Sequence, residues 1–280
     1  MRDASPLEVQ PVSGALGAVV TGLDLRVAGA REWGLVSEAF LEHLVLFFPD
    51  QSLSPLELTE VAGGFGDPTQ YPFIEGLPDA PYVIPIVKEA DERKNFGEGW
   101  HSDTTYTATP PMATALYALE VPAVGGDTLF ANMYRACETL SDGMRERLMS
   151  LRAVNSSLKR RGGGRSAGNR FQSVKFKNRE RVLEGIHPIL RRHPRTGRRA
   201  LYVNELHTTR IESLTEEESA PILGYLYAHK RRAEFTCRFR WSAGTLAVWD
   251  NRCVQHYALN DYHGHRRAML RVSIAGERPE

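Results

Sequence analysis

The sequence predicts an α+β protein whose core is mainly β, of the sandwich or barrel kind, with flanking helices. Short β-rich runs recur along the chain and are divided by Gly and Pro, which is typical of such cores. These runs are ATALYALEV, DTLFANM, RALYVNEL, FTCRFRW, GTLAVWD and AMLRVSIAG. Neither a repeat nor a linker interrupts the 280 residues, so one domain over residues 1–280 is expected.

The first third of the chain adds short strands and two helices. Glycines break residues 9–25 into β-rich pieces, which favours short strands joined by turns. Helical spacing of apolar residues predicts a helix over residues 32–47, ended by Pro49. Ser54, Pro55 and Glu57 then form a capping box at the start of a second helix, which GGFGD closes.

Later segments predict one further strand and two more helices. YVIPIV, at residues 82–87, alternates like a strand, and Pro85 places it at an edge or a bulge. One helix is expected over residues 135–151 and another over residues 215–232, where Thr215 and Glu218 repeat the capping box.

Composition excludes several classes of function. The formal net charge is +1, so the whole molecule offers no strong field to nucleic acid or to an anionic membrane. Three cysteines are too few and too scattered for a disulfide framework, which favours a reducing cytoplasm. The start has no apolar signal region, and LVLFF at residues 44–48 is far too short to span a membrane.

A basic segment stands out between residues 152 and 199. It holds fifteen of the thirty-five Lys and Arg residues against two acids, and its glycines cannot hold a regular element well. Residues from about 155 to 185 are expected to form a solvated, mobile loop, with an active-site lid as the sharper alternative. An RNA-binding patch is disfavoured because no pattern of stacking aromatics accompanies the charge.

The stretch GEGWHSDTTY carries the first sign of chemistry, because His101 and Asp103 lie two positions apart. On a strand, such residues point to the same face and can hold one ion together. Of the seven histidines after residue 101, His256 suits a third ligand because it follows the β-rich run GTLAVWD. Two imidazoles and one carboxylate form the facial triad that selects non-heme Fe(II), although packed or surface histidines are the common alternative.

Two arginines near the C-terminus point to an anion. On an extended strand, Arg267, Met269 and Arg271 share one face. An arginine directed into a barrel needs an anion, since an unpaired buried guanidinium is very costly. A cosubstrate that carries a carboxylate would serve; alternatively, both arginines pair with acids such as Asp250 or Asp261.

These motifs together resemble the taurine/alpha-ketoglutarate dioxygenase family, TauD/TfdA. The resemblance rests on WHSDTTY, PAVGGDTLF, ALYVNE, WDNRCVQHYALNDY and RRAMLRVSIAG in that order, and it runs from about residue 22 to the C-terminus. It implies a double-stranded β-helix, or jelly roll, in which His101, Asp103 and His256 bind Fe(II). It also implies that Thr128 and Arg267 hold the distal carboxylate of 2-oxoglutarate.

The resemblance further implies the reaction. Members couple the decarboxylation of 2-oxoglutarate to succinate, with O2, to oxidation of an unactivated C–H bond. Asp103 favours hydroxylation or desaturation, because related halogenases lack this carboxylate. A metal hydrolase or zinc-bound protein would use the same three ligands but would give Thr128 and Arg267 no clear role. A non-catalytic jelly-roll protein is disfavoured because every position of the triad is intact.

The substrate is expected to be a small organic acid, because Arg271 matches the position that contacts the acidic group in sulfonate-using members. A sulfonate, a phenoxyacid or an acidic natural-product intermediate would fit, and the last would make the protein a biosynthetic tailoring oxygenase. Tyr71, Thr104 and His207 are the other residues expected at the substrate. Tyr71 and His207, with Gly97, depart from the residues of taurine-using relatives, so taurine itself is disfavoured.

The resemblance also suggests how the surroundings of the site behave. Lys159, Arg160 and Arg165 of the basic segment could attract an anionic substrate. A small molecule is the expected partner, with no nucleic acid and no membrane. Since relatives are often dimers or tetramers, a homo-oligomer is possible.

Overall fold

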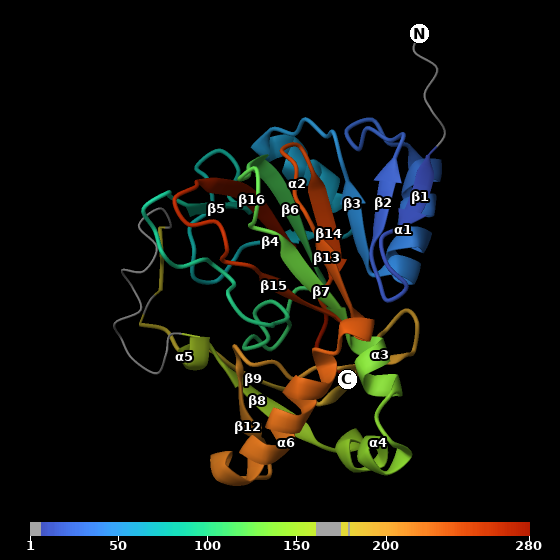
Figure 1. Cartoon of the computed structure of the whole chain (residues 1–280), viewed down its shortest axis with the longest axis vertical. Helices are drawn as coiled ribbons and strands as arrows, with labels where there is room; N and C mark the ends of the chain where they lie inside the picture. The colour runs from blue at the N-terminus through green and yellow to red at the C-terminus, as the bar shows by residue number, and fades with distance from the viewer. Residues whose placement is uncertain (1–6, 161–174, 179) are drawn as a thin grey trace.

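A large sheet spans the upper part of the protein in Figure 1, which shows a computed structural model that describes residues 7–160, 175–178 and 180–280. Its strands, in spatial order, are β1 (Glu8–Pro11), β2 (Ala18–Thr21), β3 (Val45–Phe48), β14 (Leu246–Asp250), β6 (Ala113–Glu120), β16 (Arg267–Ile274) and β4 (Pro68–Thr69). Strand β5 (Val83–Lys88) pairs with β16 as well, so β16 has both β4 and β5 as partners in addition to β6. The β2–β3 pair is parallel and the other pairs are antiparallel.

A smaller sheet packs against the large one. It consists of β13 (Thr236–Phe239), β7 (Thr128–Asn132) and β15 (Val254–Ala258), with β7 in the middle. Phe47 of the large sheet stacks on Phe239 at 3.7 Å between ring centroids and meets Phe130 edge-on at 5.6 Å. Two sheets that face each other across one apolar core form a jelly roll, so the predicted fold class is confirmed.

The other face of the large sheet is covered by the first two helices, α1 (Ala30–His43) and α2 (Pro55–Gly63), as Figure 1 shows. Val36 and Phe40 of α1 and Leu58 of α2 share a second core with Leu46 and Val248 of the sheet. The large sheet is therefore buried on both faces at its centre.

The remaining elements gather at one end of the jelly roll, the lower end in Figure 1. The strands there form two small sheets, β12 (Thr208–Ile211)–β8 (Arg152–Ser156)–β9 (Glu184–Pro188) and β10 (Leu190–Arg192)–β11 (Arg199–Leu201). The helical elements are α3 (Met133–Glu138), α4 (Asp142–Met149), α5 (Ser157–Arg160), α6 (Glu216–Lys230) and the short 3-10 helix Ala233–Phe235. None of the described helices combines the length and the apolar character that a membrane crossing requires.

Several predicted elements are confirmed. Ser54 caps α2 by accepting from the backbone N–H of Glu57, and Thr215 caps α6 through the N–H of Glu218. Strand β5 contains Pro85 and pairs only with β16 among the described strands, so it lies at an edge as expected.

The helix predicted over residues 32–47 is wrong at its C-terminal end. The helix stops at His43, where Leu44 adopts a left-handed conformation with φ 66°. Residues 45–48 instead form β3, which is fully buried between β2 and β14. A short apolar run fits a helix face and a buried strand equally well, so periodicity could not separate the two.

Two further expectations need correction. The single helix expected over residues 135–151 is two helices, because α3 ends at Glu138 and Ser141 then caps α4 by accepting from the N–H of Met144. RALYVNEL forms a strand only at Arg199–Leu201. Beyond it, the Asn204 side chain accepts from the backbone N–H of His207 at 2.9 Å and fixes an irregular turn.

Candidate active site

His101, Asp103 and His256 converge inside the jelly roll. The Asp103 Oδ1 atom lies 3.6 Å from His101 Nε2 and 3.9 Å from His256 Nε2, and all three side chains are buried. Bonds from imidazole or carboxylate to an ion such as zinc are about 2.0–2.2 Å long, so two donors on one ion lie at most about 4.4 Å apart. The three atoms could therefore hold one divalent ion.

The local structure that brings these residues together differs from the expected strand. His101 lies on a loop before β6 and forms an isolated antiparallel bridge with His256 of β15. The two residues exchange backbone hydrogen bonds of 3.0 and 2.8 Å, and Asp103 follows in a turn. The pair thus converges through a loop anchored to a strand, and the same-face argument for a strand was wrong here.

Hydrogen bonds orient the ligand atoms. His101 Nδ1 lies 2.9 Å from the carbonyl oxygen of Gly99, which can only accept, so Nδ1 carries the hydrogen and Nε2 keeps its lone pair. The Asp103 Oδ2 atom accepts from the Thr114 hydroxyl at 2.7 Å. Thr114 in turn accepts from the Asn251 amide at 2.9 Å, so Oδ1 is the oxygen left facing the imidazoles.

The charge of Asp103 is stabilised by its neighbours. Burial alone would raise the pKa of this carboxyl, but the positive Arg271 and then the two imidazoles lower it well below its usual range. Arg271 Nη2 lies 3.0 Å from Asp103 Oδ1. The carboxylate is therefore ionised at neutral pH, as a metal ligand must be.

A site for an anion lies around Arg267. This side chain is 4% exposed, and its Nε and Nη2 atoms have no hydrogen-bond partner among the described residues. Its guanidinium lies 5.7 Å from the ring centroid of Trp241, whose indole N–H donates to the Thr128 hydroxyl oxygen at 3.0 Å. The Thr128 hydrogen thus remains available, and Thr128 and Arg267 together suit a carboxylate.

The alternative that Arg267 and Arg271 pair with Asp250 or Asp261 is wrong for these two acids, although Arg271 does pair with another acid, Asp103. Both carboxylate oxygens of Asp250 accept from Arg252, at 2.8 and 2.6 Å, and Oδ2 also meets His193 Nε2 at 3.1 Å. Because Asp250 and His193 already bind these partners, we assign no metal ion to the buried group of His193, Asp250 and Cys253. Asp261 faces Arg238 at 3.6 Å.

The residues expected at the substrate also lie beside the triad. Arg271 stands over the Tyr71 ring at 5.0 Å, and the Tyr71 hydroxyl lies 3.2 Å from that of Tyr106. The His207 ring meets Tyr106 at 4.9 Å and His101 at 5.9 Å between centroids. Thr104 and Tyr71 line one open pocket, which also borders Ser273 and Gly276.

Sequence reasoning missed several contributors to this site. Tyr106 lies within WHSDTTY itself, three residues after Asp103, so that motif could have indicated it. Thr114, Trp241 and Asn251 belong to other segments, and nothing in their spacing from His101 marks them.

The structure describes only part of the basic segment, so its role at the site stays open to test. Residues 161–174 and 179, with Arg165 among them, lie outside the described residues, so the lid stays a prediction. Lys159 is an exposed residue, and its ammonium group donates to the carbonyl oxygen of Thr208.

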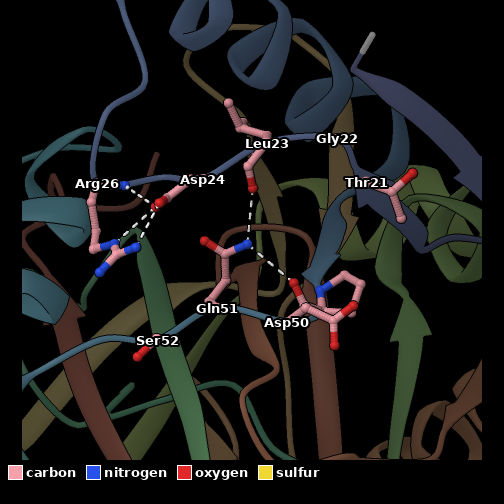
Figure 2. Close-up of a pocket in the computed structure, with 9 residues that line it drawn as sticks. Thr21, Gly22, Leu23, Asp24, Arg26, Asp50, Gln51 and Ser52 are labelled. Carbon is pink, nitrogen blue, oxygen red and sulfur yellow. Dashed lines mark hydrogen bonds and ion pairs between the residues drawn. The ribbon is translucent and has the colours of Figure 1, made fainter. Parts of the chain in front are cut away.

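A second pocket, where strands β2 and β3 end, has no comparable chemistry. It is lined by residues 21–24 and 49–52 together with Arg26 (Figure 2). The Gln51 amide donates to the carbonyl oxygens of Leu23 and Pro49, and its oxygen accepts from the N–H of Leu25. Arg26 pairs with Asp24 at 2.7 Å, so these polar groups already satisfy one another.

Comparisons with known proteins agree with this geometry. The model of the taurine catabolism dioxygenase TauD, TfdA family matches residues 8–273. The chain is 32% identical over 283 residues to an alpha-ketoglutarate-dependent sulfate ester dioxygenase of Pseudomonas putida, across 99% of this chain and 92% of that protein. It is 30% identical over 281 residues to an alkylsulfatase of Acinetobacter baylyi, across 97% and 86%.

A solved structure shows the same fold. The crystal structure of a taurine dioxygenase from Burkholderia xenovorans superposes with a TM-score of 0.82 at 32% identity, covering 98% of this chain and 93% of that one. The chain therefore belongs to the TauD/TfdA family of dioxygenases, which use Fe(II), 2-oxoglutarate and O2.

Proposed function

We propose that His101, Asp103 and His256 are the iron ligands of this dioxygenase, and that Thr128 and Arg267 bind the distal carboxylate of 2-oxoglutarate. The observation that carries the proposal is the pairing of a buried His/Asp/His cluster with a buried guanidinium that has no anionic partner among the described residues. Zinc or plain ligand binding would use the cluster but would leave Arg267 unexplained.

The residues of the chain have distinct tasks in this mechanism. The bound iron, with 2-oxoglutarate and O2, supplies the oxidation of a substrate C–H bond while the cosubstrate becomes succinate and carbon dioxide. Asp103 stays ionised beside Arg271, and Thr114 fixes which of its oxygens faces the ion. Arg267 and Thr128 orient the cosubstrate, and the buried position of the ligands limits access of water.

The substrate we propose is a small organic acid whose anionic group lies near Arg271. Tyr71 stacks on this arginine, and its hydroxyl and that of Tyr106 offer hydrogen bonds to an oxyanion. The relatives named for sulfate esters, alkyl sulfates and taurine support an acid of sulfur, with a carboxylic acid next. A tailoring step on an acidic natural-product intermediate would use the same residues.

The cytoplasmic location and the homo-oligomer stay predictions.

The test is an anaerobic titration of the metal-free protein with Fe(II) and then 2-oxoglutarate. We expect the weak visible charge-transfer band of a chelated Fe(II)–oxoacid complex, and its loss in His256→Ala and Arg267→Ala. Arg266→Ala is the matched control, because Arg266 is the exposed neighbour that pairs with Glu89 on the surface. Absence of the band in the unaltered protein with iron bound would refute the proposal.

The anionic group is tested separately by turnover. Once a screen of alkyl sulfates, sulfonates and carboxylic acids has found a substrate, Arg271→Ala should raise its KM at least tenfold, through the loss of a charged hydrogen bond. Unchanged KM and kcat in this variant would remove the acid from the proposal while leaving the cofactors in place.

A further inference from the structure

Lys88 is a buried cation that the mechanism above does not use. It ends strand β5, where its side chain is 3% exposed. In the β5–β16 pair it lies directly opposite Arg267. Side chains of directly opposed residues lie on the same face of a sheet. Ile86 and Met269 form the next pair on that face and belong to the core between the two sheets, so Lys88 also faces the interior of the jelly roll.

The Lys88 ammonium group lacks the partners that a buried charge requires. Its Nζ atom has no hydrogen-bond partner among the described residues. It stands 4.0 Å from the ring centroid of Tyr262. Burial lowers the pKa of Lys88, and the more distant Glu92 and Glu98 oppose this shift.

Lys88 and Arg267 border the same space through Tyr262. Gly126, with φ 71°, lets the backbone approach closely there. A Cβ atom at Gly126 would lie 3.3 Å from both Arg267 Cδ and Tyr262 Cδ1. Tyr262 therefore carries Lys88 on its ring face, while its ring edge and the stem of Arg267 both border Gly126.

Two buried cations opposite each other destabilise the sheet unless an anion neutralises them. Like charges at directly opposed positions repel, and each buried charge also pays for the water it has lost. One carboxylate that reaches both groups would relieve both costs. The distal carboxylate of 2-oxoglutarate is the anion already assigned to Arg267.

We propose that Lys88 is a second cation of the 2-oxoglutarate pocket, and that it shares the distal carboxylate with Arg267. This inference rests on the proposed function. It makes Lys88 a determinant of cosubstrate specificity, because a 2-oxo acid that lacks the distal carboxylate would gain nothing from it.

The experiment is calorimetric binding of 2-oxoglutarate to the Fe(II)-loaded protein under anaerobic conditions, with 2-oxopentanoate as the ligand that lacks the distal carboxylate. Lys88→Met keeps the apolar stem and should weaken 2-oxoglutarate binding about tenfold or more, as the loss of one charged hydrogen bond implies. Binding of 2-oxopentanoate should change less than threefold. Lys88→Arg should restore most of the affinity for 2-oxoglutarate.

Lys94→Met is the matched control, because Lys94 is an exposed lysine six residues further along the chain. Thermal unfolding checks that each variant is folded, and Lys88→Gln replaces Lys88→Met if the latter is not. The inference is overturned if a folded variant binds 2-oxoglutarate as tightly as the unaltered protein, or loses both ligands equally. Failure of the unaltered protein to bind 2-oxoglutarate would instead overturn the proposed function.

Discussion

At the scale of single residues, the proposed iron site depends on groups that do not touch the ion. Asp103 is held by the Thr114 hydroxyl, and Thr114 is held by Asn251. The Trp249 indole N–H donates to the same Asn251 side chain at 3.0 Å. This chain of bonds fixes the carboxylate before an ion arrives.

We therefore predict that Thr114→Val weakens Fe(II) binding by about 10- to 100-fold, the usual effect of removing such a supporting hydrogen bond. Anaerobic equilibrium binding of Fe(II) measures the change. Thr114→Ser should retain most of the affinity, since it keeps the hydroxyl. Thr59→Val is the control, because the Thr59 hydroxyl donates to the carbonyl oxygen of Pro55 within α2. Equal affinity in Thr114→Val and the unaltered protein would contradict the prediction.

The sequence predicted the charged members of the site better than their supports. His101, Asp103, His256 and the two arginines bear side chains whose chemistry restricts what they can do. Thr114 is an ordinary hydroxyl in a β-rich run, and only the pairing of β6 in the large sheet brings it to Asp103. Lys88 stands one residue beyond the predicted strand 82–87, so its place opposite Arg267 could not be read from the chain.

At the scale of elements, capping chemistry was a better guide than apolar periodicity. The Ser54 and Thr215 caps involve side chains three residues apart, so the local sequence determines them. The end of α1 depends on distant partners, because Val45–Phe48 pairs with β14, some 200 residues later. No local signal carries that pairing, and the same apolar run therefore misled the prediction.

For α2 we predict that Ser54→Ala lowers the free energy of unfolding by about 1 kcal/mol, the usual cost of losing an N-cap. Urea denaturation measures the loss. Ser52→Ala is the control, since Ser52 is exposed and lies two residues before the cap. Because α2 covers the face of the large sheet away from the triad, Fe(II) binding by Ser54→Ala should be unchanged. A loss below about 0.3 kcal/mol would show that the cap contributes little.

At the scale of the whole molecule, the end built from β8, β9 and β12 supports the active-site loop. His187 of β9 lies 2.8 and 3.0 Å from the carbonyl oxygens of Thr105 and Thr107, through the same Nε2 atom. Those carbonyls can only accept, so this nitrogen donates. Burial lowers the pKa of His187 to about 4, although the two carbonyls oppose the shift.

Stability should therefore decrease as the pH falls from about 6.5 towards 4. In that range the unfolded chain binds a proton at residue 187 and the folded chain does not, so the free energy of unfolding rises with pH. The full effect of this one group is about 3 kcal/mol. Denaturant unfolding between pH 4 and 7 should give a flatter dependence for His187→Asn than for the unaltered protein. His265→Asn replaces an exposed histidine and should keep the original slope.

The backbone bridge between His101 and His256 couples the amide hydrogen exchange of two proposed iron ligands. The amide hydrogen of each residue is bonded to the carbonyl of the other, so neither can exchange with solvent deuterium until the bridge opens. Opening the bridge also separates the two imidazoles. The exchange of these two amides would thus give the free energy of opening the site, and a bound ion should slow both amides by the same factor.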